Sequence, residues 1–450
     1  MLSDSPRRFA LPAGFFLLAF LTGWLLASGL PPGQAADEQV HAIRIDALSH
    51  GQFLGHREGG RGGVTAPPTL LEVAAVTPSG HRQARAERDL ADAIRWSKPA
   101  RFFDLGTVAT YFPAVYAPAA IELALARAFR AKPVDAFRAG RQVNLVTFCL
   151  LGAAALALAR RGRALIAAVL LLPMSLGLTA SLSGDGILIG LAAVAGACAT
   201  RGDARGWWTA AGLVTLVGLT KLPYAPLLLV LLASGRPAFP VRLGVLALSA
   251  GLMLGWAAYN QAAVMGTVGW PLYEAGPLWP GPPRSFDHFD PPAQFQVLAA
   301  DPTRAVTLPA QVFAQNPWIW RQMIGVLGWL SIEMPGWVYS MWTGVLALAA
   351  LGLLAERGPG PAPALAGLLG IALGAWAIML VQYLGWTPVG AAAIEGVQGR
   401  YFPPLLPFGA VSIPCMRPLR LPGLDAVPLA AGFVSAATVP VVVALASTLR

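Results

Sequence analysis

Long apolar segments without charged residues are the feature that most restricts how this chain can fold. The first covers residues 10–30, ALPAGFFLLAFLTGWLLASGL. At 1.5 Å per residue, a helix of this length spans a hydrocarbon core of about 30 Å. Of the 450 residues, 56% are hydrophobic and only 12% are charged, and the mean hydropathy is +0.60. The sequence therefore predicts a membrane protein that crosses the bilayer many times.

The basic residues predict the orientation of the spans, because short cytoplasmic loops are enriched in Lys and Arg. Arg160, Arg161 and Arg163 fall in one loop that we expect inside, whereas the short outer loops keep only Lys221 and Arg400. We expect an all-α fold of about eleven transmembrane helices in a single domain over residues 1–450, with the N-terminus inside. The expected spans are 10–30, 138–159, 164–183, 186–201, 207–220, 222–235, 241–263, 336–355, 362–384, 401–416 and 426–449.

Two longer polar stretches interrupt the apolar pattern. Residues 31–136 form the first outer loop, with helical segments at 84–96 and 110–129, and residues 264–335 form a second one rich in Pro, Trp and Phe. The segment 110–129 is apolar but contains two prolines. A span there would reverse the orientation of every later helix, so we predict that this segment lies along the membrane surface.

Several function classes are disfavoured by the composition and the motifs. The formal charge of +10 comes from basic residues spread among short loops, so membrane topology explains it better than a nucleic-acid partner does. The sequence has no Walker A loop, no Rossmann glycine pattern in a βαβ context and no HExxH motif. Cys149, Cys198 and Cys415 lie in or beside apolar segments, and we expect free, buried thiols.

The N-terminal segment has a second interpretation as a secretory signal that is cleaved after Ala36, which would make Asp37 the first residue. The apolar segment is longer than that of a usual signal sequence. An uncleaved first span is therefore the favoured interpretation.

Acidic residues follow the first span directly. Asp37 and Glu38 lie at the membrane surface, and in a helix that opens near Ala36, His41 falls one turn after Asp37 on the same face. The positive end of a helix dipole favours carboxylates at this place. These residues form a candidate acid/base or metal-binding cluster. Simple helix capping is the alternative, because Asp and Glu are common in any first helical turn.

Isolated polar residues also gather at the outer ends of the later spans: Asp185, Lys221, Tyr224, Glu395, Gln398, Arg400 and Tyr401. Burying an ionised side chain at bilayer depth costs roughly 2.5 to 3.5 kcal/mol, so these groups need partners or a polar ligand. Lys221 and Arg400 can hold a phosphate, with snorkelling to the headgroups as the alternative. Asp185 can instead cap the helix that starts at Gly186, and the two tyrosines can be interfacial anchors.

Six blocks, spread over nearly the whole chain, resemble the family of bacterial predicted membrane proteins called domain of unknown function 2142, which is grouped with the GT-C membrane glycosyltransferases. The blocks are DEQVHAIRIDALSHGQF at 37–53, TYFPAVYAPAA at 110–120, PMSLGLTASLSGDGILIGLA at 173–192, TKLPYAPLLLVLL at 220–232, GVLGWLSIEMPGW at 325–337 and QGRYFPPLLPF at 398–408. They occur in the family order. The chain has Ala36 where that family has a proline before its acidic pair.

The resemblance implies a GT-C-like bundle in the bacterial inner membrane, with an active site that faces the periplasm. Such an enzyme takes a sugar from a polyprenyl-phosphate donor and passes it, with inversion, to a glycan, lipid or protein acceptor. Asp37 would be the general base, and Glu38 or Asp185 would orient the acceptor or help to hold a metal. Lys221 and Arg400 would neutralise charge on the departing lipid phosphate.

The resemblance also assigns further contacts. His41, Asp185, Tyr224, Glu395, Gln398 and Tyr401 are candidate substrate-binding residues, and Asp37, His41 and Asp185 are candidate ligands for Mg²⁺, Mn²⁺ or Ca²⁺. The helices at 84–96 and 110–129 would wall the cavity and give the prenyl chain a lateral entry. A transporter of lipid-linked glycans, a cell-surface polysaccharide assembly subunit, and a polysaccharide polymerase or ligase are the competing functions.

Overall fold

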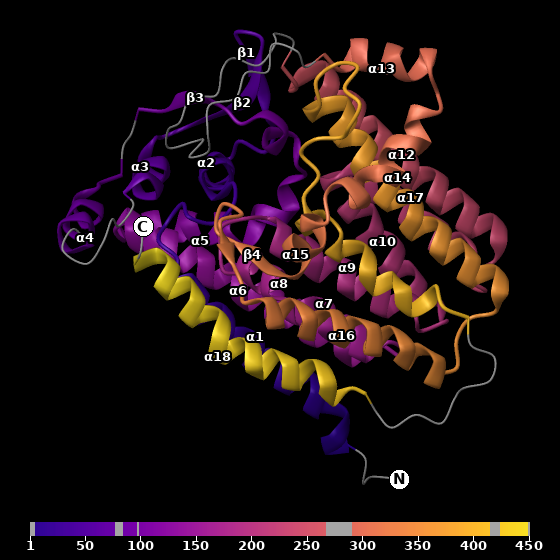
Figure 1. Cartoon of the computed structure of the whole chain (residues 1–450). Coiled ribbons are helices and arrows are strands. Elements are labelled where there is room, and N and C mark those ends of the chain that lie inside the picture. Colours follow the sequence, from indigo (N-terminus) through magenta and orange to yellow (C-terminus); the bar gives the residue numbers. More distant parts are fainter. Residues whose placement is uncertain (1–4, 77–83, 97–98, 267–289, 415–423, 449–450) are drawn as a thin grey trace.

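The computed structural model of this chain is described here for residues 5–76, 84–96, 99–266, 290–414 and 424–448. It is mostly helical (Figure 1). The α-helices are α1 (Ser5–Gly29), α2 (Glu38–Ser49), α3 (Thr69–Ala75), α4 (Ala84–Ala93), α5 (Ala117–Ala128), α6 (Pro133–Leu158), α7 (Arg163–Leu171), α8 (Pro173–Thr179), α9 (Asp185–Ala199), α10 (Ala204–Thr220), α11 (Leu228–Leu232), α12 (Phe239–Ala263), α13 (Pro291–Ala300), α14 (Arg304–Gln315), α15 (Trp318–Gly325), α16 (Gly336–Gly352), α17 (Pro361–Trp386) and α18 (Ala426–Thr448). The 3₁₀ helices are η1 (Gly106–Thr110), η2 (Pro113–Tyr116), η3 (Leu222–Leu227), η4 (Leu353–Ala355), η5 (Gly399–Tyr401) and η6 (Pro403–Val411).

Two small antiparallel sheets accompany the helices, which the all-α prediction did not include. One has the order β1–β2–β3 and is formed by β1 (His56–Glu58), β2 (Arg61–Ala66) and β3 (Arg101–Asp104). The other is a hairpin of β4 (Val326–Leu327) and β5 (Ile332–Glu333), in which Val326 pairs with Glu333. Both sheets lie in the stretches that were expected to be outer loops.

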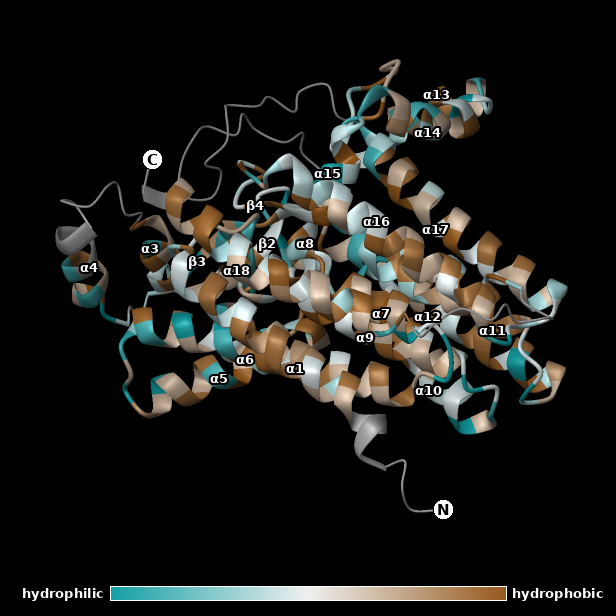
Figure 2. Ribbon diagram, turned by 60° about the horizontal axis from the view of Figure 1, so that its bottom comes forward, coloured by the Kyte–Doolittle hydropathy of each residue, from teal (hydrophilic) through white to brown (hydrophobic). Residues whose placement is uncertain are grey.

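Six helices in the described residues are long and apolar enough to cross a membrane: α1 over Ala10–Gly29, α6, α12, α16 extended by η4, α17 and α18. This finding agrees with the expectation of a multi-span membrane protein. In Figure 2, brown hydrophobic residues run along helices such as α12 and α17. Leu252 and Leu254 of α12 and Leu365 of α17 are exposed, as is typical of a surface that faces lipid rather than water.

The other expected spans are shorter or broken, and proline explains where. The expected span 164–183 is divided into α7 and α8 at Pro173, which cannot donate the backbone hydrogen bond of a helix interior but fits the first turn of α8. The expected span 401–416 is 3₁₀ helix over 399–401 and 403–411, with Pro403, Pro404 and Pro407 in it. The number of eleven crossings therefore stays a prediction.

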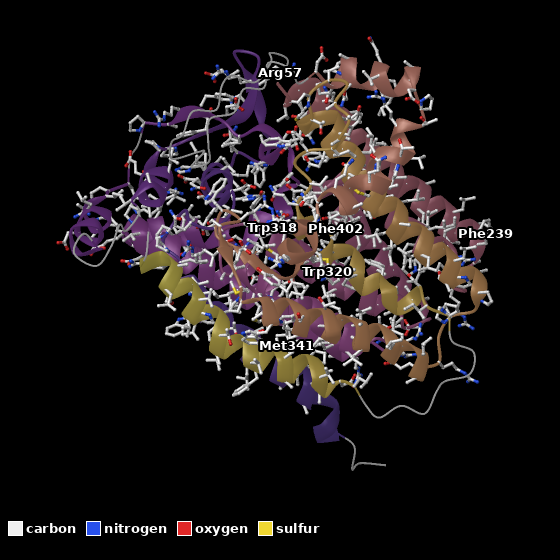
Figure 3. The ribbon with its side chains drawn as sticks, in the orientation of Figure 1. Arg57, Phe239, Trp318, Trp320, Met341 and Phe402 are labelled. Atoms are coloured by element: carbon white, nitrogen blue, oxygen red, sulfur yellow. The ribbon has the colours of Figure 1, made fainter. Side chains whose placement is uncertain are left out.

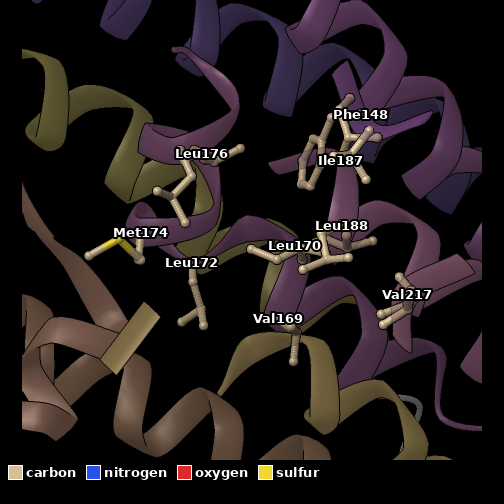
Figure 4. Packing of buried hydrophobic residues seen from close by; sticks show 14 of the residues in the cluster. Phe148, Val169, Leu170, Leu172, Met174, Leu176, Ile187, Leu188 and Val217 are labelled. Atoms are coloured by element: carbon tan, nitrogen blue, oxygen red, sulfur yellow. The ribbon is translucent and has the colours of Figure 1, made fainter. Parts of the chain in front are cut away.

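The core is a layer of helices around α9, which is buried on nearly all sides. Helix α6 packs against α1, α5 and α9, while α9 also contacts α10 and η6. Figure 4 shows this packing, with labelled side chains from α6 to α10: Phe148, Val169, Leu170, Leu172, Met174, Leu176, Ile187, Leu188 and Val217. A helix that is apolar all round needs such an environment. Cys149 and Cys198 are free and buried here, as expected, and Cys415 lies outside the described residues.

The segment expected to lie along the membrane surface consists of η1, η2 and α5. Helix α5 has 12 residues, which is too short to span a bilayer, and it packs on α2 and α6. Ile121, Leu125 and Phe129, spaced four residues apart, are exposed on one face of it. The face is apolar enough to contact lipid.

Candidate functional site

Asp37 stands at the entrance to α2 rather than inside it. The helix begins at Glu38, two residues after the expected start near Ala36, and Asp37 is the N-cap residue in a left-handed conformation with a φ of 59°. Its carboxylate makes no capping hydrogen bond. Instead, it accepts a hydrogen bond from Arg400 Nη2 in an ion pair. A non-glycine residue in this conformation is uncommon, and here it turns the carboxylate away from the helix toward the cation.

Arg400 is almost entirely buried, with 3% of its side chain exposed, and its Nε has no hydrogen-bond partner among the residues that the structure describes. Helix α15 fixes its position. The Gly399 N–H donates to Gln322 Oε1 over 2.9 Å. A Cβ atom at Gly399 would lie 2.2 Å from the carbonyl oxygen of Ile319 and from the backbone nitrogen of Met323, so only glycine allows η5 to approach α15 this closely.

A second ion pair joins the ends of two core helices. Lys221 Nζ lies 2.6 Å from Asp185 Oδ1, and the two side chains are 13% and 8% exposed. Asp185 is the first residue of α9, and Lys221 ends α10 where the chain turns into η3. The rings of Tyr111 and Tyr401 lie 4.9 and 5.3 Å from the ammonium nitrogen, so the cation also receives favourable ring interactions.

His41 lies close enough to both pairs to feel their charges. Its Nδ1 lies 2.7 Å from Tyr116 Oη, and the residue is 2% exposed. Burial lowers the pKa of His41 to about 4, against the opposing effect of the nearby Asp185 and Asp37, and with a further lowering by Lys221 and Arg400. The imidazole is therefore neutral at pH 7. We call these five residues, Asp37, His41, Asp185, Lys221 and Arg400, the charged cluster.

Glu38 has a different environment from its neighbour Asp37. It is fully buried, and its two oxygens accept four hydrogen bonds: from Arg141 Nε at 2.7 Å, Arg141 Nη2 at 2.6 Å, the Gly33 N–H at 2.9 Å and the Leu182 N–H at 3.0 Å. These contacts use both lone pairs of each oxygen. The sequence suggested a catalytic role for Glu38, but its geometry fits a residue that positions α2.

Arg141 of α6 was not singled out by the sequence, although it completes this arrangement. It also donates to the carbonyl oxygens of Ala27, Leu30 and Pro31 at the end of α1. One buried ion pair thus fastens α1, α2, α6 and the turn before α9 together, next in the chain to Asp37 of the charged cluster. The signal in the sequence was an arginine inside a segment expected to span the membrane, one turn after Arg138 at the start of that segment.

The remaining expected site residues divide into two groups. The Tyr224 hydroxyl donates to the carbonyl oxygen of Tyr401 over 2.8 Å, so it holds the backbone beside Arg400. Gln398 is half-buried, and its Oε1 is buried without a hydrogen-bond partner in the described part of the chain. The side chain of Glu395 is exposed, and its backbone N–H donates to Thr387 Oγ1. Within the described ranges, no hydrogen bond joins the side-chain oxygen of Gln398 to the charged cluster.

The structure gives no support to the metal site expected from Asp37, His41 and Asp185. Within the described ranges, no group of three or more His, Cys, Asp or Glu side chains is placed to share a metal ion. The two carboxylates pair with Arg400 and Lys221 instead. The negative charges of the two carboxylates are therefore balanced by these two cationic side chains.

A small pocket, which we call the hairpin pocket, lies beside Arg400. Its walls come from the loop after α1 (Leu30, Ala36), from α8 (Met174, Leu178) and from the β4–β5 hairpin (Leu327, Leu330), and Arg400 is the charged residue in its lining. Trp329 in the hairpin turn donates from Nε1 to the carbonyl oxygen of Gly33 over 3.1 Å. In Figure 3, Trp318 of α15 and Phe402 after η5 mark the region where α15 packs against η5.

The sequence did not indicate the hairpin pocket, because its strands have only two residues each and show no alternation of apolar and polar residues. A family model described as "Predicted membrane protein (DUF2142)" matches residues 18–408 and so includes the whole charged cluster and the hairpin. No curated protein and no solved structure matches the chain.

Proposed function

The chain belongs to the DUF2142 family of predicted membrane proteins, and we propose that it is a membrane glycosyltransferase that moves a sugar from a polyprenyl-phosphate donor to an acceptor at the outer membrane face. One observation carries the proposal. Two carboxylates and two cations, from the N-terminal ends of α2 and α9, the C-terminal end of α10 and η5, are gathered around His41 and beside an apolar pocket. Buried charges inside a membrane protein are costly, so a cluster of them that is not needed to fasten helices together supports a substrate site.

The two cations supply what a lipid-phosphate leaving group needs. As the bond between the anomeric carbon and the phosphate oxygen breaks, negative charge collects on the phosphate, and fixed cations in a water-poor site stabilise that charge. Lys221 presents a compact ammonium group, and Arg400 presents a planar guanidinium that suits phosphate oxygens. A phosphate bound by both would compete with Asp37 and Asp185 for these partners.

Asp37 then takes the proton. With Arg400 engaged by phosphate, the Asp37 carboxylate accepts the proton of the acceptor hydroxyl, whose oxygen attacks the anomeric carbon from the face opposite the phosphate. The new glycosidic bond forms as the bond to the phosphate breaks, and the polyprenyl phosphate leaves with the electron pair. Asp37 is the more accessible partner of its ion pair, with 33% of its side chain exposed against 3% for Arg400.

Other residues hold this arrangement in place. Asp185 keeps Lys221 oriented, and neutral His41, fixed by Tyr116, adds no competing charge near the phosphate. Glu38 and Arg141 fix α2 and thereby Asp37. Tyr224 supports the backbone next to Arg400.

The proposal includes an orientation. The charged cluster faces the periplasm of a bacterial inner membrane, and the N-terminus and Arg160 lie on the cytoplasmic side, with about eleven crossings between them. Helix α9 supports it, because Asp185 begins this helix while Arg201 follows its other end. The acceptor is then an extracytoplasmic glycan, lipid or protein.

The test is transfer by the purified protein. Incubation with a panel of polyprenyl-phosphate sugars and acceptors, followed by mass spectrometry, is expected to detect a glycosylated product. Asp37→Asn should abolish the product while donor binding persists. Asp92→Asn is the matched control, because Asp92 is half-exposed on α4 and forms an ion pair with Lys132 over 3.3 Å, away from the charged cluster. Undiminished transfer by Asp37→Asn would refute the role of Asp37 as general base. If the wild type binds the donor but transfers no sugar, a lipid-linked glycan transporter or assembly subunit would be favoured instead.

A further inference from the structure

We propose that Tyr111 and Tyr401 bind the sugar of the lipid-linked donor, with their rings as apolar walls and their hydroxyl groups as hydrogen-bonding contacts. The inference rests on the proposed function, because it assigns the part of the substrate that follows the phosphate. Tyr401 was a candidate substrate-binding residue from the sequence, whereas Tyr111 was not singled out. Tyr111 lies in the loop between η1 and η2, and Tyr401 is the last residue of η5.

Both tyrosine rings border Lys221. Its Nζ lies 4.9 Å from the ring centroid of Tyr111 and 5.3 Å from that of Tyr401. The Tyr401 centroid also lies 5.6 Å from Arg400 Cζ, so this ring borders both cations of the charged cluster. In the proposed reaction the phosphate binds Lys221, and the anomeric carbon of the sugar is joined directly to an oxygen of that phosphate. The sugar therefore begins next to the two rings.

The hydroxyl groups of these two tyrosines differ from those of the tyrosines that support the site. Tyr116 Oη lies 2.7 Å from His41 Nδ1, and the Tyr224 hydroxyl donates to a backbone carbonyl oxygen over 2.8 Å. Within the described part of the chain, neither Tyr111 nor Tyr401 makes a hydrogen bond through its hydroxyl. Both residues are half-buried, and neither hydroxyl oxygen is shut off from solvent. These two groups are therefore open to a ligand.

Tyr111 keeps its proton at neutral pH. Burial raises the pKa of the Tyr111 hydroxyl above its ordinary value, and the charge of Lys221 opposes this shift. The charges of Asp185 and Asp37 also act on the hydroxyl, so both carboxylates of the charged cluster are near it. A neutral hydroxyl both donates and accepts hydrogen bonds, as the hydroxyl groups of a sugar do. Lys221 thus serves the anionic part of the donor, and Tyr111 serves its uncharged part.

Tyr111 is held in place through the residues on either side of it. The carbonyl oxygen of Thr110 accepts hydrogen bonds from Trp256 Nε1 over 3.1 Å and from Asn260 Nδ2 over 3.3 Å, both on α12. The ring of Phe112 meets that of Trp256 edge to face, with 5.3 Å between the centroids. Because the backbone is fixed on both sides, little conformational entropy is lost when Tyr111 binds a sugar.

Tyr111→Phe tests the inference, because it keeps the ring beside Lys221 and removes only the hydroxyl oxygen. Lipid binding to the purified protein is measured in detergent micelles without an acceptor, so that no transfer is needed. The probes are polyprenyl phosphates that carry glucose, mannose, galactose or arabinose, and sugar-free polyprenyl phosphate of the same chain length. For the sugar lipid that the wild type binds most tightly, we expect Tyr111→Phe to weaken the affinity about two- to tenfold, the effect of one hydrogen bond. The affinity for the sugar-free lipid should change less than about twofold.

Tyr259→Phe on α12 is the matched control. Tyr259 is 39% exposed and stacks on Trp256, and within the described ranges its hydroxyl makes no hydrogen bond to the charged cluster. Its affinity for both kinds of lipid should stay within about twofold of the wild type. Tyr401→Phe should lose affinity for the sugar lipid in the same way as Tyr111→Phe.

Four results would overturn the inference: unchanged affinity of Tyr111→Phe for the sugar lipid, an equal loss for the sugar-free lipid, a lower melting temperature of Tyr111→Phe, or wild-type protein that binds no sugar lipid more tightly than the sugar-free one. The second and third would assign the hydroxyl to the support of Lys221 or of the fold. If Tyr111→Phe loses affinity for the sugar lipid while the wild type transfers no sugar, the inference stands and only the enzymatic function is refuted. If the wild type transfers sugar and Tyr111→Phe keeps its kcat/KM, only the inference is refuted.

Discussion

The ion pair of Glu38 and Arg141 makes a quantitative prediction about what holds the site together. Glu38→Gln removes the only carboxylate that touches Arg141 among the described contacts, at side-chain exposures of 0% and 1%. Removing one partner of a buried pair costs about 3–5 kcal/mol, because the remaining charge stays buried and uncompensated. The new amide also presents donors to N–H groups that need acceptors. We therefore expect a loss of about 4 kcal/mol in the free energy of unfolding.

The assay is unfolding of the purified protein by SDS in mixed micelles, followed by tryptophan fluorescence. Glu333→Gln is the control, because its pair with Arg321 is half-exposed at 3.6 Å, and a pair of that kind contributes about 0–1 kcal/mol. Arg141→Gln and the double variant complete a cycle. The double variant should lose much less than the sum of the two single variants. A loss in Glu38→Gln as small as that in Glu333→Gln, or additive single losses, would refute the reasoning.

Three further predictions follow from the charged cluster and its support. Lys221→Met should destabilise the protein in the same SDS titration, because Asp185 is left as an unpaired buried charge, and it should weaken polyprenyl-phosphate binding. The double variant with Asp185→Asn should recover stability, since the unpaired charge is removed. It should not recover lipid affinity, since the cation is still missing. The free energy of unfolding should fall as pH drops from about 6.5 towards about 4, because His41 binds a proton in the unfolded chain but stays neutral in the folded protein. This loss should amount to about 3 kcal/mol and should be absent in His41→Gln. The same pH profile in His41→Gln and in the wild type would contradict the buried, neutral imidazole. Gly399→Ala should separate η5 from α15 and abolish lipid-phosphate binding. The control Gly385→Ala has open space around its new Cβ, so it should be neutral or stabilise α17 by up to about 1 kcal/mol. Normal lipid-phosphate binding by Gly399→Ala would contradict the close contact between η5 and α15.

The membrane character and several span boundaries follow from the sequence because apolar length is a local property. Residues 138–159 and 362–384 were expected to span, and the structure has α6 over Pro133–Leu158 and α17 over Pro361–Trp386. The helix break at Pro173 was not predicted, because the residues before and after it are all apolar. A continuous helix and two shorter helices would show the same run of apolar residues. The proline itself was the available signal.

The neighbourhood of the charged cluster was predictable in part. The charge bias of the loops placed Asp37, Asp185, Lys221 and Arg400 on the same side, and the structure brings these residues together. Which acid meets which base was not predictable, since Asp37 and Arg400 are separated by 363 residues and only tertiary packing joins them. The same holds for Glu38 and Arg141, and this pair is what separates the roles of two adjacent carboxylates.

We propose that the charged cluster catalyses sugar transfer from a lipid phosphate. The most direct test measures two products in one reaction of the purified wild-type protein with a polyprenyl-phosphate sugar and an acceptor. The account predicts equal amounts of free polyprenyl phosphate and of new glycosidic bonds. Intact lipid-linked sugar that changes leaflets in vesicles while no polyprenyl phosphate is released would contradict it.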